Sequence, residues 1–259
     1  KYSYSDYAQE QNRWLDTEQA NEKLNYWMTK LKEPFEVVSL PLDFRRENNQ
    51  LNHLKYQEIF IEEGLNNKLR ELCRKHNCTL YMLLLAGFSG LIYRYTNQTD
   101  MVLGTTLANR NSVYTDKLIG FFSNTLPLRI NLNSNMEFKD LIQHIKKLTL
   151  EAFDNQEVPL EMIAKNLQRE RKSNQNSIFQ IVFLLQNFPV EFIKMNQIEM
   201  KNLNIISNTG TKFDIVLHVF ESLNGLRIRL EYNAGLFKES TIKAFLNYYK
   251  LLLEGCVEN

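Results

Sequence analysis

The most apolar stretch of the chain runs from Leu80 to Tyr93, and this feature constrains the fold more than any other. Its length, about fourteen residues, is too short for a helix that crosses a bilayer, which needs about 20. A run this apolar on every side instead predicts a helix buried inside a globular domain. The rest of the chain must therefore supply elements that cover this helix.

Periodic and alternating segments supply those elements. Apolar residues at helical spacing predict helices within 6–31, at 65–76, 79–95 and 138–153, after Pro159, and at 239–253 before Gly255. Alternating or β-rich runs predict strands at 56–62, 100–107, 125–132, 178–186, 212–221 and 226–232. The last two strands flank Ser222-Leu223-Asn224-Gly225, which is typical of a hairpin turn. Helices interleaved with strands indicate an α/β sandwich with a mixed sheet.

The proline-containing segment 33–50 interrupts this pattern and is the best internal boundary. It predicts a helical segment and connector at 1–50 and a larger α/β part at 51–259. The chain opens on lysine, in a polar segment without signal-peptide character, and we interpret it as an excised piece of a longer protein.

Charge and cysteine content narrow the environment. The net charge is +1, from 31 basic and 30 acidic residues spread along the chain, so neither nucleic acid nor a membrane is expected as a partner. Cys73, Cys78 and Cys256 form an odd set without metal-ligand spacing. We expect free thiols and a cytoplasmic location.

Catalytic candidates are few when the residues are considered alone. His53, His76 and His144 are interpreted as surface histidines. His218 follows Asp214 in a predicted strand, and a packed histidine is favoured there over a catalytic base. No metal-ligand motif, nucleophile elbow, phosphate loop or dinucleotide fingerprint occurs, so no metal or bound cofactor is predicted.

Six motifs, in order along the chain, extend this interpretation. Residues 4–11 resemble a YxDYAxWQ stretch, with Glu10 in the tryptophan position. Residues 104–110 lead into 119–129, which resembles IGxFVNTLxLR with Ser123 in place of valine and is the most specific match. Residues 155–161 resemble HQDxPFE, and 171–183 resemble RDxSRNPLFQVxF, with Arg171 and Asn176 kept and four other positions changed. Residues 211–215 and 230–237 resemble TKFDL and LEYNxxLF.

Together these motifs resemble the condensation domains of nonribosomal peptide synthetases, specifically their C-terminal lobe. The motif positions of interest are Tyr4, Asp6, Gly120, Phe122, Gln156, Pro159 and Asp214. The resemblance implies a chloramphenicol acetyltransferase-like α/β sandwich lobe with a mixed, largely antiparallel sheet and flanking helices. It also implies amide formation between donor acyl or peptidyl and acceptor aminoacyl thioesters, both carried on phosphopantetheine arms of carrier proteins.

The family's HHxxxDG motif precedes the YxDYA stretch, and this sequence contains no adjacent histidine pair. The chain is therefore expected to form one wall of the reaction channel and to be inactive alone. The resemblance implies that Arg110 pairs with the aspartate of that absent motif, with a solvated arginine as the alternative. It implies that Asn124, Asn176 and Arg171 support the channel, with a turn residue that caps the following strand as the alternative for Asn124.

Partners follow from the same resemblance: the N-terminal lobe, donor and acceptor carrier proteins, and an adenylation domain. Residues 109–118 are expected to cross beneath the channel, and 202–211 to reach toward the N-terminal lobe. Two alternatives remain open, namely a docking lobe without chemistry and a residual acyltransferase that uses His218 as its base.

Overall fold

The structure, a computed structural model, describes residues 2–46, 53–110, 112–168, 176, 178–186, 212–222 and 224–258. The N-terminal half contains α1 (Tyr4–Leu15), α2 (Glu18–Lys30), β1 (Leu54–Glu62), α3 (Glu63–Lys75), α4 (Leu80–Thr96), β2 (Asp100–Leu107), α5 (Val113–Asp116) and β3 (Asn124–Asn131). The C-terminal half contains α6 (Phe138–Asp154), α7 (Leu160–Leu167), β4 (Ile181–Gln186), β5 (Ile215–Ser222), β6 (Gly225–Asn233) and α8 (Glu239–Glu258). The predicted alternation of helices and strands is confirmed.

The strands form one mixed sheet in the order β1-β6-β5-β4-β2-β3. β4 pairs in parallel with β2 and β5, and the other three pairings are antiparallel. The predicted fold class, a mixed and largely antiparallel sheet with flanking helices, is therefore confirmed.

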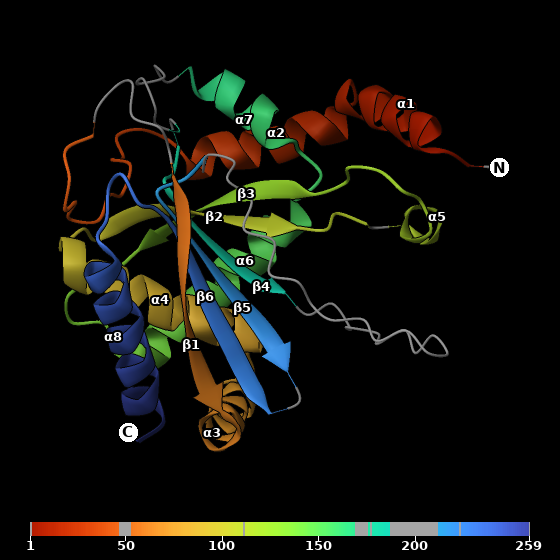
Figure 1. The fold of residues 1–259 in the computed structure, drawn as a ribbon. Helices are drawn as coiled ribbons and strands as arrows, with labels where there is room; N and C mark the ends of the chain where they lie inside the picture. Colours follow the sequence, from red (N-terminus) through yellow and green to blue (C-terminus); the bar gives the residue numbers. More distant parts are fainter. Residues whose placement is uncertain are drawn as a thin grey trace, which may run out of the picture.

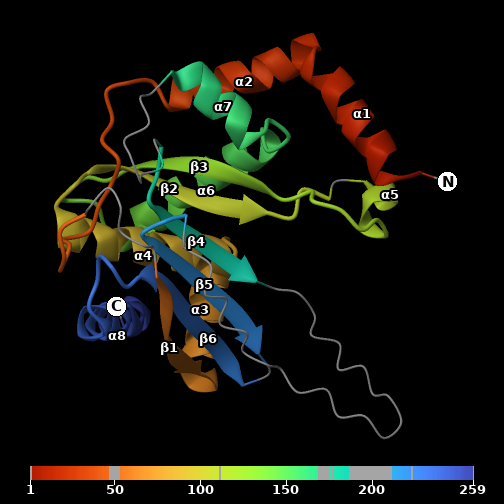
Figure 2. The same cartoon turned by 45° about the horizontal axis from the view of Figure 1, so that its top comes forward.

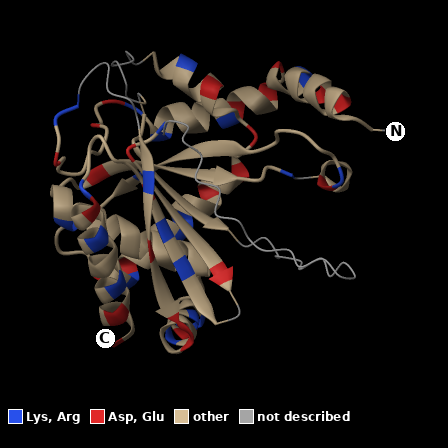
Figure 3. Cartoon of the chain, in the orientation of Figure 1, with Lys and Arg blue, Asp and Glu red and all other residues tan. Residues whose placement is uncertain are grey.

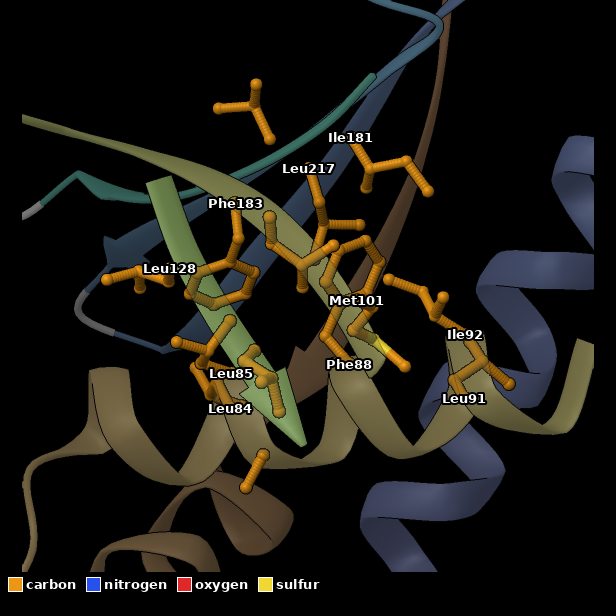
Figure 4. Packing of buried hydrophobic residues seen from close by; sticks show 14 of the residues in the cluster. Leu84, Leu85, Phe88, Leu91, Ile92, Met101, Leu128, Ile181, Phe183 and Leu217 are labelled. Carbon is orange, nitrogen blue, oxygen red and sulfur yellow. The ribbon is translucent and has the colours of Figure 1, made fainter. Parts of the chain in front are cut away.

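Helices α3, α4, α6 and α8 cover one face of the sheet, and α1, α2 and α7 lie beyond its β3 edge (Figures 1 and 2). The apolar run that constrained the fold is α4, whose buried residues include Leu84, Leu85 and Phe88. Their side chains point toward Leu128, Phe183 and other strand residues (Figure 4). Burial of large apolar side chains at this interface stabilises the fold, each by about 1.5–3 kcal/mol.

The β5–β6 hairpin is confirmed by the pairing of Ser222 with Gly225. Gly225 has a φ of +141°, a conformation that side-chain-bearing residues rarely adopt. A Cβ at this position would lie 2.0 Å from the backbone oxygen of Ile61 in β1. Glycine therefore serves both the turn and the close approach of the neighbouring strand.

The predicted end of the last helix before Gly255 is wrong, because α8 continues to Glu258. An isolated glycine costs a helix only about 1 kcal/mol, and Val257, beyond it, packs against the hydrophobic core. The predicted crossing segment 202–211 and Arg171 lie outside the described residues.

Lysine and arginine are interspersed with aspartate and glutamate along the helices and strands (Figure 3). Among the described helices none alone has the length and apolar character of a membrane span, and only the pair α3 and α4, bent by 102°, meets that test together. The three cysteines are free thiols, as predicted.

Candidate functional site

The loop between β2 and β3 is folded around Arg110. Its guanidinium donates hydrogen bonds to the backbone oxygens of Thr115 and, at 3.0 Å, Leu118. The same group lies over the ring of Phe122, 4.2 Å from the centroid. Arg110 thus shapes its own loop in this chain, while its predicted pairing with an aspartate outside the sequence stays a prediction.

Helix α1 packs against the same loop. Ser3 and Asp6 form a capping box at the helix start, and hydrogen bonds from Ser3 lower the pKa of Asp6. The Tyr4 hydroxyl donates to the Phe121 oxygen at 2.9 Å, and its ring meets Phe122 edge to face. A Cβ on Gly120 would lie 2.3 Å from the Tyr4 ring, so this contact requires glycine.

Asn124 joins β3 to the loop before α7. Its side-chain nitrogen donates to the backbone oxygens of Gln156 and Val158 at 2.8 and 2.7 Å. Its side-chain oxygen accepts from Leu160 N–H at 3.2 Å. Pro159, between these partners, is the N-cap of α7. One buried amide therefore satisfies three backbone groups that no regular element pairs.

We call residues 2–14, 109–110, 112–122 and 155–160 the α1 corner. They surround a pocket of about 560 Å³, lined by aromatic and carboxylate side chains. The aromatic residues of the lining are Tyr2, Tyr7, Trp14 and Tyr114, and its carboxylates are Glu10 and Glu157. The structure thus brings together, at one end of the molecule, parts of the motif segments 4–11, 104–110, 119–129 and 155–161.

A second group lies where β4 and β5 begin. Asp214 is 4% exposed and pairs with Arg46 at 2.5 Å. Burial raises the pKa of Asp214, although Arg46 opposes that shift. The side-chain oxygen of Asn176 accepts from Ile178 N–H at 2.9 Å and so forms the turn into β4. In the described part of the chain, Asp214 therefore holds the Arg46 side chain, and Asn176 holds the backbone that leads into β4.

Arg129, the last residue of the most specific motif, is a supporting residue that the motifs did not single out. Arg129 makes a two-point ion pair with Asp100 of β2, at 2.9 and 2.6 Å. It also donates to the backbone oxygens of Lys30, Lys32 and Pro34. Strand alternation could have indicated Arg129, because its side chain lies on the opposite side of β3 from Leu128. There it lies near Asp100 on the paired strand β2.

His218 lies among polar neighbours on the sheet. Its Nδ1 is 3.2 Å from the Gln186 amide nitrogen, and its Nε2 is 3.4 Å from Glu231. The interaction with His218 lowers the pKa of Glu231. Because each ring nitrogen already faces a side chain of the sheet, this arrangement favours a structural histidine.

No group of three or more histidine, cysteine, aspartate or glutamate side chains suited to a metal occurs in the described part of the chain. The pocket-lining residues of the α1 corner can hold a polar or apolar organic group, and among them the Tyr2 hydroxyl donates a hydrogen bond to the Glu10 carboxylate.

The chain is an α/β lobe whose motif-bearing loops gather at one end. A family model described as "Condensation domain" matches residues 1–259. The chain is 37% identical to a linear gramicidin synthase of Brevibacillus parabrevis over 257 residues, which are 99% of this chain and 5% of that protein. It is 32% identical to surfactin synthase subunit 1 of Bacillus subtilis, covering 100% of this chain and 7% of that protein.

The condensation domain from Monacolin K polyketide synthase MokA superposes with a TM-score of 0.87 at 23% identity, over 98% of this chain and 61% of that one. The chain therefore belongs to the condensation domain family of nonribosomal peptide synthetases. It spans about three fifths of the solved condensation domain and a small fraction of the curated synthetases.

Proposed function

We propose that this chain forms the C-terminal lobe of a domain that condenses two carrier-bound substrates. The acceptor α-amino nitrogen attacks the donor thioester carbonyl, the amine loses a proton, the C–S bond breaks, and the donor carrier's thiol leaves. Condensation domains act on substrates tethered to phosphopantetheine. The observation that carries the proposal is the match of the whole chain to the condensation family.

We propose further that the catalytic histidines come from residues outside this sequence. The chain's four histidines, His53, His76, His144 and His218, include no adjacent pair. In this proposal the chain shapes the channel and positions the substrates, and positioning alone supplies several kcal/mol of catalysis. Arg110 pairs with the aspartate of the HHxxxDG motif, and Asn124, Asn176 and Arg171 support the channel wall.

The surface that receives the N-terminal lobe is proposed to be the outer side of the loop between β2 and β3. Val113, Tyr114, Ile119 and Phe121 expose 70% to 98% of their surface there. Exposed apolar residues gathered in one segment favour a protein contact. The share of the solved condensation domain that this chain leaves uncovered is large enough to supply that lobe.

Carrier proteins and an adenylation domain are the proposed further partners, and a cytoplasmic location is proposed from the free thiols. The predicted boundary between 1–50 and 51–259 stays a prediction. The docking lobe without chemistry remains a possible outcome of the experiment below.

The test joins this chain to the N-terminal lobe of a condensation domain from the linear gramicidin synthase that it resembles. The fusion and the chain alone are incubated with loaded donor and acceptor carrier proteins, and dipeptidyl thioester is measured by mass spectrometry. We expect product from the fusion and background only from the chain alone. A folded fusion without product would contradict the proposal and favour the docking lobe.

The His218→Ala variant of the chain alone and of the fusion provides the control. We expect no change in either, because His218 is held by Gln186 and Glu231. Product from the chain alone that this substitution abolishes would make His218 the base.

A further inference from the structure

The pocket of the α1 corner has an aromatic wall on two sides. Tyr2, Tyr7 and Trp14 line it from α1 and the residues before it, and Tyr114 lines it from α5. The rings of Tyr2 and Tyr114 are 5.6 Å apart and tilted by 43°. Aromatic faces carry partial negative charge and attract cations within about 6 Å. The wall therefore suits a cation better than an anion.

Two carboxylates line the pocket, and Glu10 favours a bound cation more than Glu157 does. Glu157 pairs with Lys23 at 2.7 Å, and this lysine largely offsets its charge. Glu10 accepts a hydrogen bond from the Tyr2 hydroxyl, and this bond raises the pKa of Tyr2 to about 12. Within the described ranges no lysine or arginine forms an ion pair with Glu10. Its charge is thus available to a ligand in the pocket.

We propose that this pocket binds an ammonium group carried on an apolar chain, namely the side chain of a basic amino acid such as lysine or ornithine. The volume of about 560 Å³ lies in the range of small-ligand sites and accepts one such side chain. The methylene chain packs on the rings, and the ammonium group lies toward Glu10. The assignment to a substrate side chain rests on the proposed function, whereas binding of the ammonium group does not.

Three lysine-related compounds separate the sources of the ammonium group. Nα-acetyl-lysine methylamide carries it only on the side chain, norleucine methylamide only on the α-carbon, and Nα-acetyl-norleucine methylamide not at all. Each is titrated into the chain, and the emission of Trp14 is followed. The other tryptophan, Trp27, is buried and donates its indole N–H to the Asn155 oxygen, so its emission stays constant.

We expect the acetyl-lysine compound to bind about tenfold more tightly than the compound without an ammonium group, from one cation–π contact and one partly exposed ion pair. The compound with only an α-ammonium group is expected to resemble the uncharged one. Equal binding of the acetyl-lysine and uncharged compounds, or no binding of any, would overturn the proposal. Tighter binding of the α-ammonium compound would overturn the assignment to a side chain.

Variants locate the site. Glu10→Gln is expected to weaken acetyl-lysine binding about fivefold and to leave the uncharged compound unaffected, because only the charge changes. Glu22→Gln, on the exposed surface of α2 outside the pocket, is the matched control and is expected to change neither. Trp14→Phe is expected to remove the fluorescence change while calorimetry still detects binding. Equal effects of both glutamate substitutions would place the ligand elsewhere.

This experiment and the fusion assay fail separately. Binding of acetyl-lysine without product from the fusion rejects the proposed reaction and keeps the pocket. Product without any preference for the ammonium group rejects the pocket and keeps the reaction.

Discussion

Helix α4 and the α1 corner both gather large aromatic side chains, yet they use them differently. Phe88 of α4 is fully buried among Phe183, Phe245 and Tyr249. In the α1 corner the rings of Tyr4 and Tyr114 remain exposed, and backbone hydrogen bonds to side chains hold the loops. Buried aromatic packing around α4 therefore stabilises the fold. We expect substitutions of exposed side chains in the α1 corner to leave that packing intact.

The largest expected effect tests the core half of that comparison. Phe88→Ala removes a side chain that no water reaches and leaves a cavity, so we expect a loss of about 3–5 kcal/mol in unfolding free energy. Phe121→Ala in the α1 corner, where the ring is 78% exposed, is expected to change it by less than about 0.5 kcal/mol. Urea unfolding followed by circular dichroism measures both. Similar losses for Phe88→Ala and Phe121→Ala would show that the core and the α1 corner contribute equally to stability.

The next effect concerns Arg129 of β3, which joins the sheet to the end of α2 and the segment after it. Arg129→Ala leaves Asp100 and three backbone oxygens without their donor, and it removes a side chain that is only 16% exposed. We expect a loss of about 2–3 kcal/mol in unfolding free energy, with Arg129→Lys recovering only part because it cannot make the two-point contact. Arg94→Ala, at an exposed site on α4, serves as the control and is expected to cost less than about 0.5 kcal/mol.

The helix and strands of the core show which parts of the fold could be predicted from the sequence. The apolar run at 80–93 predicted the buried helix because period and composition are local properties. The strand at 125–132 was predicted from alternation alone, and its buried side is confirmed by Leu126, Leu128 and Ile130. The sheet order with its two parallel pairings, by contrast, depends on chain crossings that no local pattern encodes.

The site was predictable only in part, for a related reason. The motifs named Asn124 and Gly120, but their partners Val158 and Tyr4 lie 34 and 116 positions away in sequence. The pairing of Arg46 with Asp214 joins the connector to the residue before β5 across 168 positions. Such contacts depend on tertiary structure, so the sequence indicated which residues matter and left open what they touch.

A smaller effect is expected inside the α1 corner. Asn124→Ala removes three hydrogen bonds to backbone and leaves two carbonyl oxygens unpaired. We expect a loss of about 2 kcal/mol or less in unfolding free energy, since water can reach part of the loop, together with faster amide hydrogen exchange at Leu160. Core amides of α4 should keep their protection. Loss of that protection would show that the corner and the core unfold as one unit.

The smallest expected effect is a dependence of the unfolding free energy on pH. It arises from a half-buried histidine and not from the exposed carboxylate of the α1 corner. His144 of α6 is half buried, and desolvation together with Lys30 and Lys147 lowers its pKa below the ordinary 6.5. The folded state therefore binds fewer protons than the unfolded state below pH 6.5, so stability is complete above that pH and is lost as pH falls toward the folded pKa. Asp6 in the α1 corner also has a lowered pKa, but it is exposed to solvent and titrates at lower pH.

His144→Gln is accordingly expected to flatten the fall in unfolding free energy between pH of about 7.5 and 5.5, measured by urea titration at each pH. Lys147→Gln removes one of the two lysines that oppose protonation of His144, so it should produce a weaker change in the same direction. Asp6→Asn should leave the slope in this window unchanged, because its carboxylate stays ionised throughout. An unchanged slope in His144→Gln would mean that solvent reaches the imidazole as freely as it reaches the α1 corner.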